Sequence, residues 1–349
     1  MGRQAVGAVG AMIRLEKLRS FPVEEFLLTR IALAPDASRV ALGHKAFRTL
    51  NAETGGVERE FAYGEFLGQL RYSPDGRYLA AVNVADNHPA TRGRVTVFEA
   101  ASGAAALDRE AALPVETCAF QAGESGWQIA WNDPRLEAAA EGGAAHIAGR
   151  IARAELGGNG RAAALEPLAL GPQQIRSLAA GAGGFTCFVR EAVGSEHTVE
   201  NAQLVFRKFR LLSVAPGGQI RRDLDLGIGA GVCALSPDGK LLAVEMVDFK
   251  NNERHVSVVD AETGVEANLL PLEANTLPVL EFSQDGAYFL CLKEDAEGDF
   301  NTLRLWRTAD LKLVGEAQLD LSYHAVASCL EHSTLAFLGG GKLDLFAIE

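Results

Sequence analysis

One turn sequence recurs along the chain, each time between two short runs in which apolar and polar residues alternate. The clearest copy spans residues 232–264, where Ser236-Pro237-Asp238-Gly239 separates the first two runs. Proline presets its own φ, aspartate can accept hydrogen bonds from the backbone that follows it, and glycine adopts positive φ without cost. Alternation at period two is typical of half-buried strands. The segment therefore predicts strand, turn, strand, loop, strand and turn.

The same pattern returns in residues 31–55, 70–103 and 280–311. The turn aspartates Asp36 and Asp75 are 39 residues apart, and Asp238 and Asp285 are 47 apart, whereas Asp75 and Asp238 are separated by 163. That last gap equals about three repeat lengths, so it has room for two degenerate units. Apolar runs separated by glycine turns in residues 115–170 and 173–226 supply them, and residues 323–349 add a final unit with only three strands.

The missing strand of the final unit predicts how the chain closes. If each unit is a four-stranded antiparallel sheet, the segment at residues 15–23, which precedes the first full unit, has no partner at its end of the chain, and the final unit has an open edge. Pairing the two satisfies both edges. We therefore predict an all-β, seven-bladed β-propeller closed by an N-terminal strand that completes the last blade. We expect a flexible extension at residues 1–14 and a single propeller domain at residues 15–349. The seven expected blades are residues 26–63, 66–112, 115–170, 173–226, 229–273, 277–320 and 323–349.

The repeat resembles the WD-repeat and related β-propeller family. The resemblance is carried by the turns at Ser73 and Ser236, the variant turn at Ser283, and third strands ending in VFEAASG, VVDAETG and LWRTADL. It covers nearly the whole chain. The Trp-Asp dipeptide of the best-marked members is absent, and Leu305-Trp306 comes nearest to it, so true WD repeats and looser bacterial propellers both stay open. The resemblance is specific for the fold and weak for function.

The net charge and the cysteine content limit the kinds of partner and the cellular compartment that we expect. A formal net charge of −12 argues against nucleic acid or an anionic membrane as a partner bound by charge attraction. No apolar stretch approaches the roughly 20 residues that span a bilayer, and the first residues do not form a signal-peptide pattern, with Met1 and Met12 both open as the native start. The five cysteines, which we expect to be reduced packing residues of a cytoplasmic protein, are Cys118, Cys187, Cys233, Cys291 and Cys329.

Unequal loops indicate where a partner would bind. The connection between second and third strands is short near residues 43–46 but long at 83–94, 190–203, 245–255 and 293–302. All of these connections emerge on one face of a propeller, and four elaborated loops there favour a contact surface with aromatic anchors over simple solvated loops. The candidate partner-binding residues are Asp86, His88, Arg92, His197, Asp248, Phe249, Lys250, Glu253, Asp295, Asp299 and Phe300.

Catalytic patterns are weak. The histidines His44, His88, His146, His197, His255 and His324 fall on different blades without a local His-x-x-His or Cys-x-x-Cys pair, so we expect no metal and no cofactor. The turn serines do not lie in a Gly-x-Ser-x-Gly elbow. Residues expected at the channel end of the first strands are Phe66, Glu116, Gln174, Ala230, Pro278 and His324. Glu116 and His324 are the one acid–base or ligand pair among them.

The sequence therefore favours a non-enzymatic interaction scaffold, monomeric on its own, which binds a protein or peptide through its loop-rich face as a subunit of a larger complex. The alternative is a metal-assisted hydrolase or lactonase-like enzyme that uses Glu116 and His324 in the central channel. A third reading, a sensor that binds a small ligand and signals to a partner, has no sequence feature that separates it from the scaffold.

Overall fold

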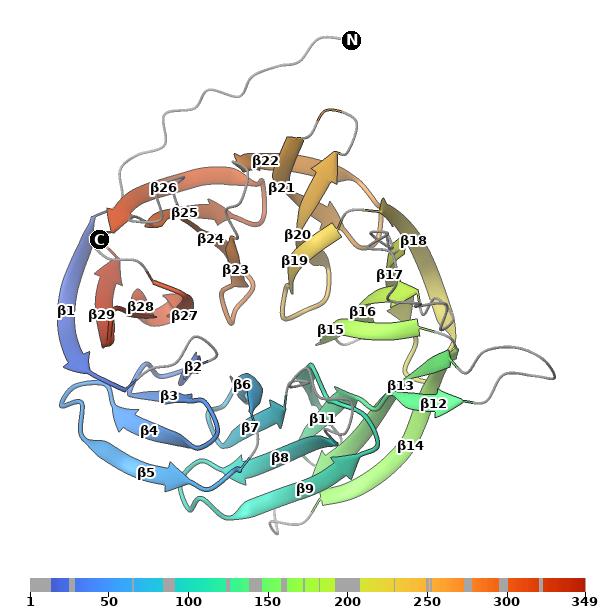
Figure 1. Ribbon diagram of the computed structural model, residues 1–349, viewed down its shortest axis with the longest axis horizontal. Helices are drawn as coiled ribbons and strands as arrows, with labels where there is room; N and C mark the ends of the chain where they lie inside the picture. Colours follow the sequence, from blue (N-terminus) through green and yellow to red (C-terminus); the bar gives the residue numbers. More distant parts are fainter. Residues whose placement is uncertain are drawn as a thin grey trace, which may run out of the picture.

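The structure is a computed structural model of the 349-residue chain. It describes residues 14–24, 29–64, 66–83, 92–123, 126–137, 146–157, 162–171, 173–181, 183–191, 208–228, 230–248, 251, 253–272, 278–294, 301–319 and 323–348. These residues form seven antiparallel sheets arranged as blades around a central axis (Figure 1). The predicted all-β, seven-bladed propeller is confirmed.

The first three blades contain the following strands. Blade 1 is β2 (Arg30–Leu33), β3 (Arg39–Gly43), β4 (Phe47–Asn51) and β5 (Val57–Phe61). Blade 2 is β6 (Leu67–Tyr72), β7 (Tyr78–Asn83), β8 (Gly93–Glu99) and β9 (Ala105–Ala111). Blade 3 is β10 (Cys118–Ala122), β11 (Trp127–Asn132), β12 (Arg135–Glu137), β13 (His146–Leu156) and β14 (Ala162–Gly171).

The next three blades repeat the four-stranded order. Blade 4 is β15 (Gln173–Gly181), β16 (Gly184–Glu191), β17 (Lys208–Val214) and β18 (Ile220–Ile228). Blade 5 is β19 (Ala230–Leu235), β20 (Leu241–Asp248), β21 (Glu253–Asp260) and β22 (Glu266–Leu272). Blade 6 is β23 (Val279–Phe282), β24 (Tyr288–Glu294), β25 (Asn301–Arg307) and β26 (Lys312–Leu319).

Blade 7 joins the two ends of the chain. It is β27 (Ala325–Cys329), β28 (Thr334–Gly339), β29 (Lys342–Ile348) and β1 (Leu15–Pro22), with the 3₁₀ turn η1 (Leu330–His332) after β27. Strand β1 pairs antiparallel with β29 from Leu15↔Ile348 to Pro22↔Lys342, with a bulge between Lys17 and Arg19. The predicted closing strand is confirmed, and in Figure 1 it forms the outer edge beside the last blade.

Two blades differ from the prediction. Blade 3 has a fifth strand, β12, which pairs with the start of β13 and prolongs the blade beyond β11. In blade 5, β20 and β21 stay paired as far as Asp248↔Glu253. The loop predicted at residues 245–255 is therefore wrong, because the connection between the two strands is shorter. The residues that read as polar loop are strand residues because Glu245 and Arg254 neutralise each other by an ion pair across the two strands.

The recurring turn is held by the same hydrogen bonds in each full copy. In blade 2, Ser73 Oγ donates to Asp75 Oδ1 at 2.6 Å and accepts from the Tyr78 N–H at 2.9 Å. Asp75 Oδ1 also accepts from the Arg77 N–H. The turns that start at Ser236 and Ser283 repeat this network. The aspartate therefore caps its own turn, as its position in the sequence indicates.

Blade 1 keeps the turn with a different residue at its last position. Ala37 has φ 55° where Gly76, Gly239 and Gly286 have φ near 70°. Asp36 Oδ1 still accepts from Ser38. Left-handed backbone is unfavourable for alanine because Cβ approaches the following carbonyl, so this copy of the turn is strained.

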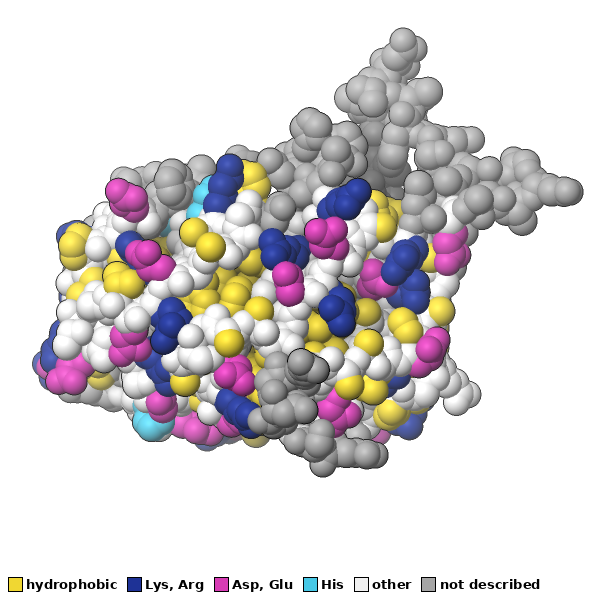
Figure 2. Space-filling model, turned by 90° about the horizontal axis from the view of Figure 1, so that it is seen from below, with side chains coloured by type: hydrophobic (Ala, Val, Ile, Leu, Met, Phe, Trp, Pro, Cys, Tyr) yellow, Lys and Arg dark blue, Asp and Glu magenta, His cyan; other side chains and the backbone are white. Residues whose placement is uncertain are grey.

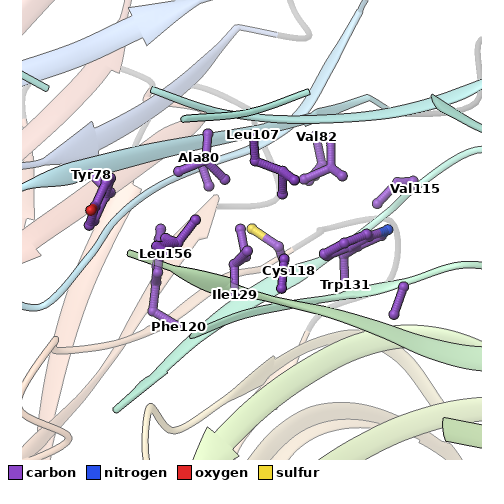
Figure 3. Close-up of a cluster of buried hydrophobic side chains, with 14 of the residues drawn as sticks. Tyr78, Ala80, Val82, Leu107, Val115, Cys118, Phe120, Ile129, Trp131 and Leu156 are labelled. Atoms are coloured by element: carbon purple, nitrogen blue, oxygen red, sulfur yellow. The ribbon is translucent and has the colours of Figure 1, made fainter. Parts of the chain in front are cut away.

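The core lies between neighbouring blades rather than in one central mass. Figure 3 shows the cluster between blades 2 and 3, where Tyr78, Val82 and Leu107 face Cys118 and Trp131 across the gap. Blades 7 and 1 pack in the same way through Leu343 and Leu33. Because both faces of each blade are covered, second strands such as β7 and β28 are buried along their whole length.

The rim carries mixed charge. On the side shown in Figure 2, Lys and Arg side chains are interspersed with Asp and Glu, and hydrophobic side chains are visible between them. On this side, the described residues form no extended patch of one sign that would attract a polyanion. No helix in the described ranges is long and apolar enough to cross a membrane.

Candidate interaction face

The ring has two unlike faces. We call the loop face the one where each inner strand begins and where second strands connect to third strands, because successive antiparallel strands return there. Its described connection ends are Gly43 and Phe47, Asn83 and Gly93, Glu191 and Lys208, Asp248 and Glu253, and Glu294 and Asn301. The opposite turn face carries the aspartate turns at Asp36, Asp75, Asp238 and Asp285.

Most of the predicted contact residues fall in connections that the structure does not describe. Those outside the described residues are Asp86, His88, His197, Phe249, Lys250, Asp295, Asp299 and Phe300. Arg92, Asp248 and Glu253 are described: Arg92 immediately precedes β8, Asp248 ends β20 and Glu253 begins β21. Their role in partner binding stays a prediction.

A buried asparagine fixes the base of the blade 2 connection. Asn83 Nδ2 donates to the Arg92 carbonyl at 2.5 Å, and Asn83 Oδ1 accepts from the Arg94 N–H at 2.8 Å. Arg94 then pairs with Asp108 at 2.8 Å, while the outward Arg92 reaches Glu110 only at 3.4 Å. The two ends of this connection are thus held together, and the Arg92 side chain is 78% exposed above that base.

An ion pair fixes the base of the blade 5 connection. Glu245 on β20 is buried at 4% exposure and accepts from Arg254 Nε on β21 at 2.8 Å. Its other oxygen accepts from the Val232 N–H on β19 at 3.3 Å. A buried charge pair of this kind depends on both partners, because either charge alone would pay the full desolvation cost.

The acid proposed for the channel, Glu116, contacts an arginine and an amide side chain. Its carboxylate pairs with Arg176 at 2.5 Å and accepts from Gln174 Nε2 at 3.0 Å, and Gln174 in turn accepts from Arg190. Burial raises the pKa of Glu116, while Arg176 and Arg190 oppose the rise. These contacts join blades 3 and 4 at the channel mouth.

The structure does not bring Glu116 and His324 together. Glu116 precedes β10 of blade 3, and His324 precedes β27 of blade 7, where its N–H donates to the Leu338 carbonyl at 3.0 Å. Blades 4 to 6 separate them on one side of the ring and blades 1 and 2 on the other. Within the described part of the chain, no three His, Cys, Asp or Glu residues are grouped as metal ligands.

Glu281 on β23 is a carboxyl at a blade interface that the sequence pattern did not indicate. Its Oε1 accepts from both the N–H and the hydroxyl of Ser328 on β27, at 3.0 and 3.1 Å. Burial raises the pKa of Glu281 to about 8, against the smaller lowering effects of Ser328 and Arg71. The sequence signal is a charged residue inside the alternating run LEFS, which points it toward a neighbouring blade.

The cysteines are packing residues. Four of the five are buried, Cys233 is half-buried, and none forms a disulfide. Burial raises the pKa of Cys118 to about 11 and that of Cys291 to about 12. Thiols of this kind hold their protons at neutral pH and are poor nucleophiles.

Comparisons with known proteins identify the fold only. No family model matches the chain, and no curated protein matches it by sequence. Among solved structures, hydrazine synthase from Kuenenia stuttgartiensis is similar over 90% of this chain and 94% of that chain, with a TM-score of 0.62 and 12% identity. The Cps50 (Swd1) β-propeller domain of Myceliophteria thermophila is similar over 96% of this chain and 100% of that chain, with a TM-score of 0.61 and 13% identity.

Proposed function

We propose that this propeller is a non-enzymatic interaction scaffold of the WD-repeat type, which binds a partner protein or peptide with its loop face as a subunit of a larger complex. The observation that carries the proposal is the way its connections leave the ring. Described ends of five second-to-third-strand connections lie on one face. Asn83 and the Glu245–Arg254 pair tie two of them down at their bases.

The mechanism is rigid presentation. Each blade packs on both neighbours through a buried cluster, and β1 closes the ring, so the loop bases are fixed relative to one another. Binding then costs little ordering entropy in the scaffold itself. The similarity to the Cps50 (Swd1) propeller domain supports the fold on which this proposal stands.

The test compares two matched triple variants of blade 5. The loop-face variant carries Asp248→Ala, Phe249→Ala and Lys250→Ala. The turn-face control carries Glu262→Ala, Val265→Ala and Lys240→Ala, which also removes one acid, one apolar residue and one base, all exposed. Tagged proteins are purified gently from the native cells and co-eluting proteins are quantified by mass spectrometry.

We expect the loop-face variant to lose a stoichiometric partner that the wild type and the control retain, at an unchanged thermal midpoint. Equal recovery of that partner with all three proteins would contradict the proposal. Metal analysis of the same samples addresses the hydrolase alternative, which requires a stoichiometric metal that Glu116→Gln releases. We expect no such metal.

A further inference from the structure

Four side chains gather at the loop face where blades 1 and 2 meet. We call Arg30, His44, Lys45 and Phe66 the cationic corner. Arg30 begins β2 and pairs across the sheet with Gly43, the last residue of β3. His44 and Lys45 lie in the short connection from β3 to β4, and Phe66 immediately precedes β6.

Backbone contacts hold this corner in place. The His44 N–H donates to the Ala46 carbonyl at 3.1 Å, which closes the short connection on itself. The Gly64 and Leu67 N–H groups donate to the carbonyls of Lys45 and His44, at 2.9 and 2.8 Å. The connection in blade 1 is thereby fastened to the segment that leads into blade 2, so its side chains are presented from a fixed backbone.

Phe66 organises the two cationic side chains of the connection. Lys45 Nζ lies 4.3 Å from the centroid of the Phe66 ring. The His44 ring meets Phe66 edge-on, with centroids 4.8 Å apart. A cation within about 6 Å of an aromatic face is attracted by the ring quadrupole. Lys45 is exposed and Phe66 is half-buried, so both are within reach of a partner.

No described carboxylate forms an ion pair with Arg30 or Lys45 at this corner. The guanidinium of Arg30 donates only to main-chain carbonyls, through Nε to Gly68 at 2.9 Å and through Nη1 to Thr29 at 3.4 Å. Cations near the loop face that do pair with a described carboxylate include Arg94 with Asp108, Arg176 with Glu116, Lys208 with Asp225 and Arg254 with Glu245.

The corner is therefore a local positive site in an acidic chain. Burial lowers the pKa of the Arg30 guanidinium, since desolvation disfavours the charged form. Burial and the neighbouring Lys45 and Arg30 charges lower the pKa of His44. An incoming carboxylate would supply a counter-charge to Arg30, which is already partly desolvated, and an ion pair contributes most in such surroundings.

We propose that the cationic corner binds an acidic segment of the partner protein, with Asp or Glu carboxylates paired to Arg30 and Lys45 and an apolar side chain against Phe66. This inference rests on the proposed scaffold function and names the chemistry of its partner. Alternating acidic and apolar residues fit the geometry, because an exposed lysine and a half-buried aromatic ring lie side by side.

The test uses a fluorescein-labelled peptide of alternating glutamate and leucine, followed by fluorescence anisotropy with the full chain. We expect saturable binding that weakens with salt, and no binding of the matched lysine–leucine peptide. Lys45→Glu should weaken binding by about tenfold or more, because it replaces a charge-assisted contact with repulsion. The control is Lys240→Glu, an exposed turn-face lysine that gives the same change in net charge.

Arg30→Gln provides a second variant, and its thermal midpoint reports whether the corner still folds. Equal weakening by Lys45→Glu and Lys240→Glu would show general charge attraction and overturn the inference. Displacement by inorganic phosphate at constant ionic strength would indicate a small-anion site instead and overturn it too. A partner that binds the loop face normally in the Lys45→Glu variant would refute the acidic contact while leaving the scaffold function intact.

Discussion

Replacing Asp344 should weaken the closure of the ring more than replacing any of its partners. Asp344 on β29 is fully buried, and its Oδ2 accepts from Lys17 Nζ on β1 at 2.8 Å and from the Tyr323 hydroxyl at 2.5 Å. A hydrogen bond to a charged group contributes about 1.5–3 kcal/mol, whereas a half-exposed ion pair such as that with Lys17 contributes about 0.5–1 kcal/mol. We expect Asp344→Ala to cost about 3 kcal/mol of unfolding free energy and Lys17→Ala to cost about 1 kcal/mol or less.

Urea unfolding at neutral pH measures both changes, and hydrogen exchange of β1 shows whether the lost stability is at the closure. Burial acts to raise the pKa of Asp344, but the hydrogen bonds from Lys17 and Tyr323 outweigh it and lower the pKa. The ionised form therefore stabilises the folded state above the unfolded pKa of about 4, and this contribution is lost as the pH falls below it. Equal effects of Asp344→Ala and Lys17→Ala, or a deficit that stays constant down to low pH, would refute the reasoning.

Two further predictions concern single residues. Gly76→Ala should lower the unfolding free energy by about 1 kcal/mol, because the residue has φ 70°. Ala37→Gly, at φ 55°, should raise the unfolding free energy by about 0.5 kcal/mol. Urea midpoints that move in the same direction for both variants would contradict the turn assignment. Glu281 has its pKa raised to about 8 by burial, so the folded state binds more protons than the unfolded state from about pH 4 upward and wild-type stability falls over that window. Glu281→Gln keeps an acceptor for Ser328 and should gain stability relative to wild type between pH 5 and about 8; thermal midpoints that change in parallel with pH would disprove this.

Local turn chemistry made the fold predictable. Proline, aspartate and glycine at fixed places in the turns at Ser73 and Ser236 act within a few residues, and the hydrogen bonds of Asp75 and Asp238 are those that the residue types indicate. The repeat spacing then located blades 3 and 4, and the unpaired final unit located β1.

Contacts between distant segments were not predictable in the same way. Glu281 and Ser328 are 47 residues apart, and Lys17 and Asp344 are 327 apart. Nothing in the local pattern of either residue names its partner. The limits of β20 and β21 were missed for a related reason: Glu245 and Arg254 look like loop residues until their pairing across the sheet is seen.

The candidate interaction face was predictable in its location but not in its side-chain contacts. Its location follows from strand order, which the sequence supplies, whereas the cationic corner depends on how the connection in blade 1 meets the segment before β6. The sequence pattern placed His44 among the histidines on different blades and Phe66 at the channel end of a first strand, and it gave no signal for Arg30. Their proximity is a property of the folded ring.

Hydrogen–deuterium exchange of the chain, free and bound to a partner purified from its native cells, tests the central claim most directly. The account predicts slower exchange on binding in loop-face peptides that contain residues 43–47, 62–68 and 245–254. Turn-face peptides that contain residues 35–39, 73–77 and 236–241 should exchange at the same rate in both states. Protection confined to the turn face or to the outer strands, with the loop face unchanged, would contradict it.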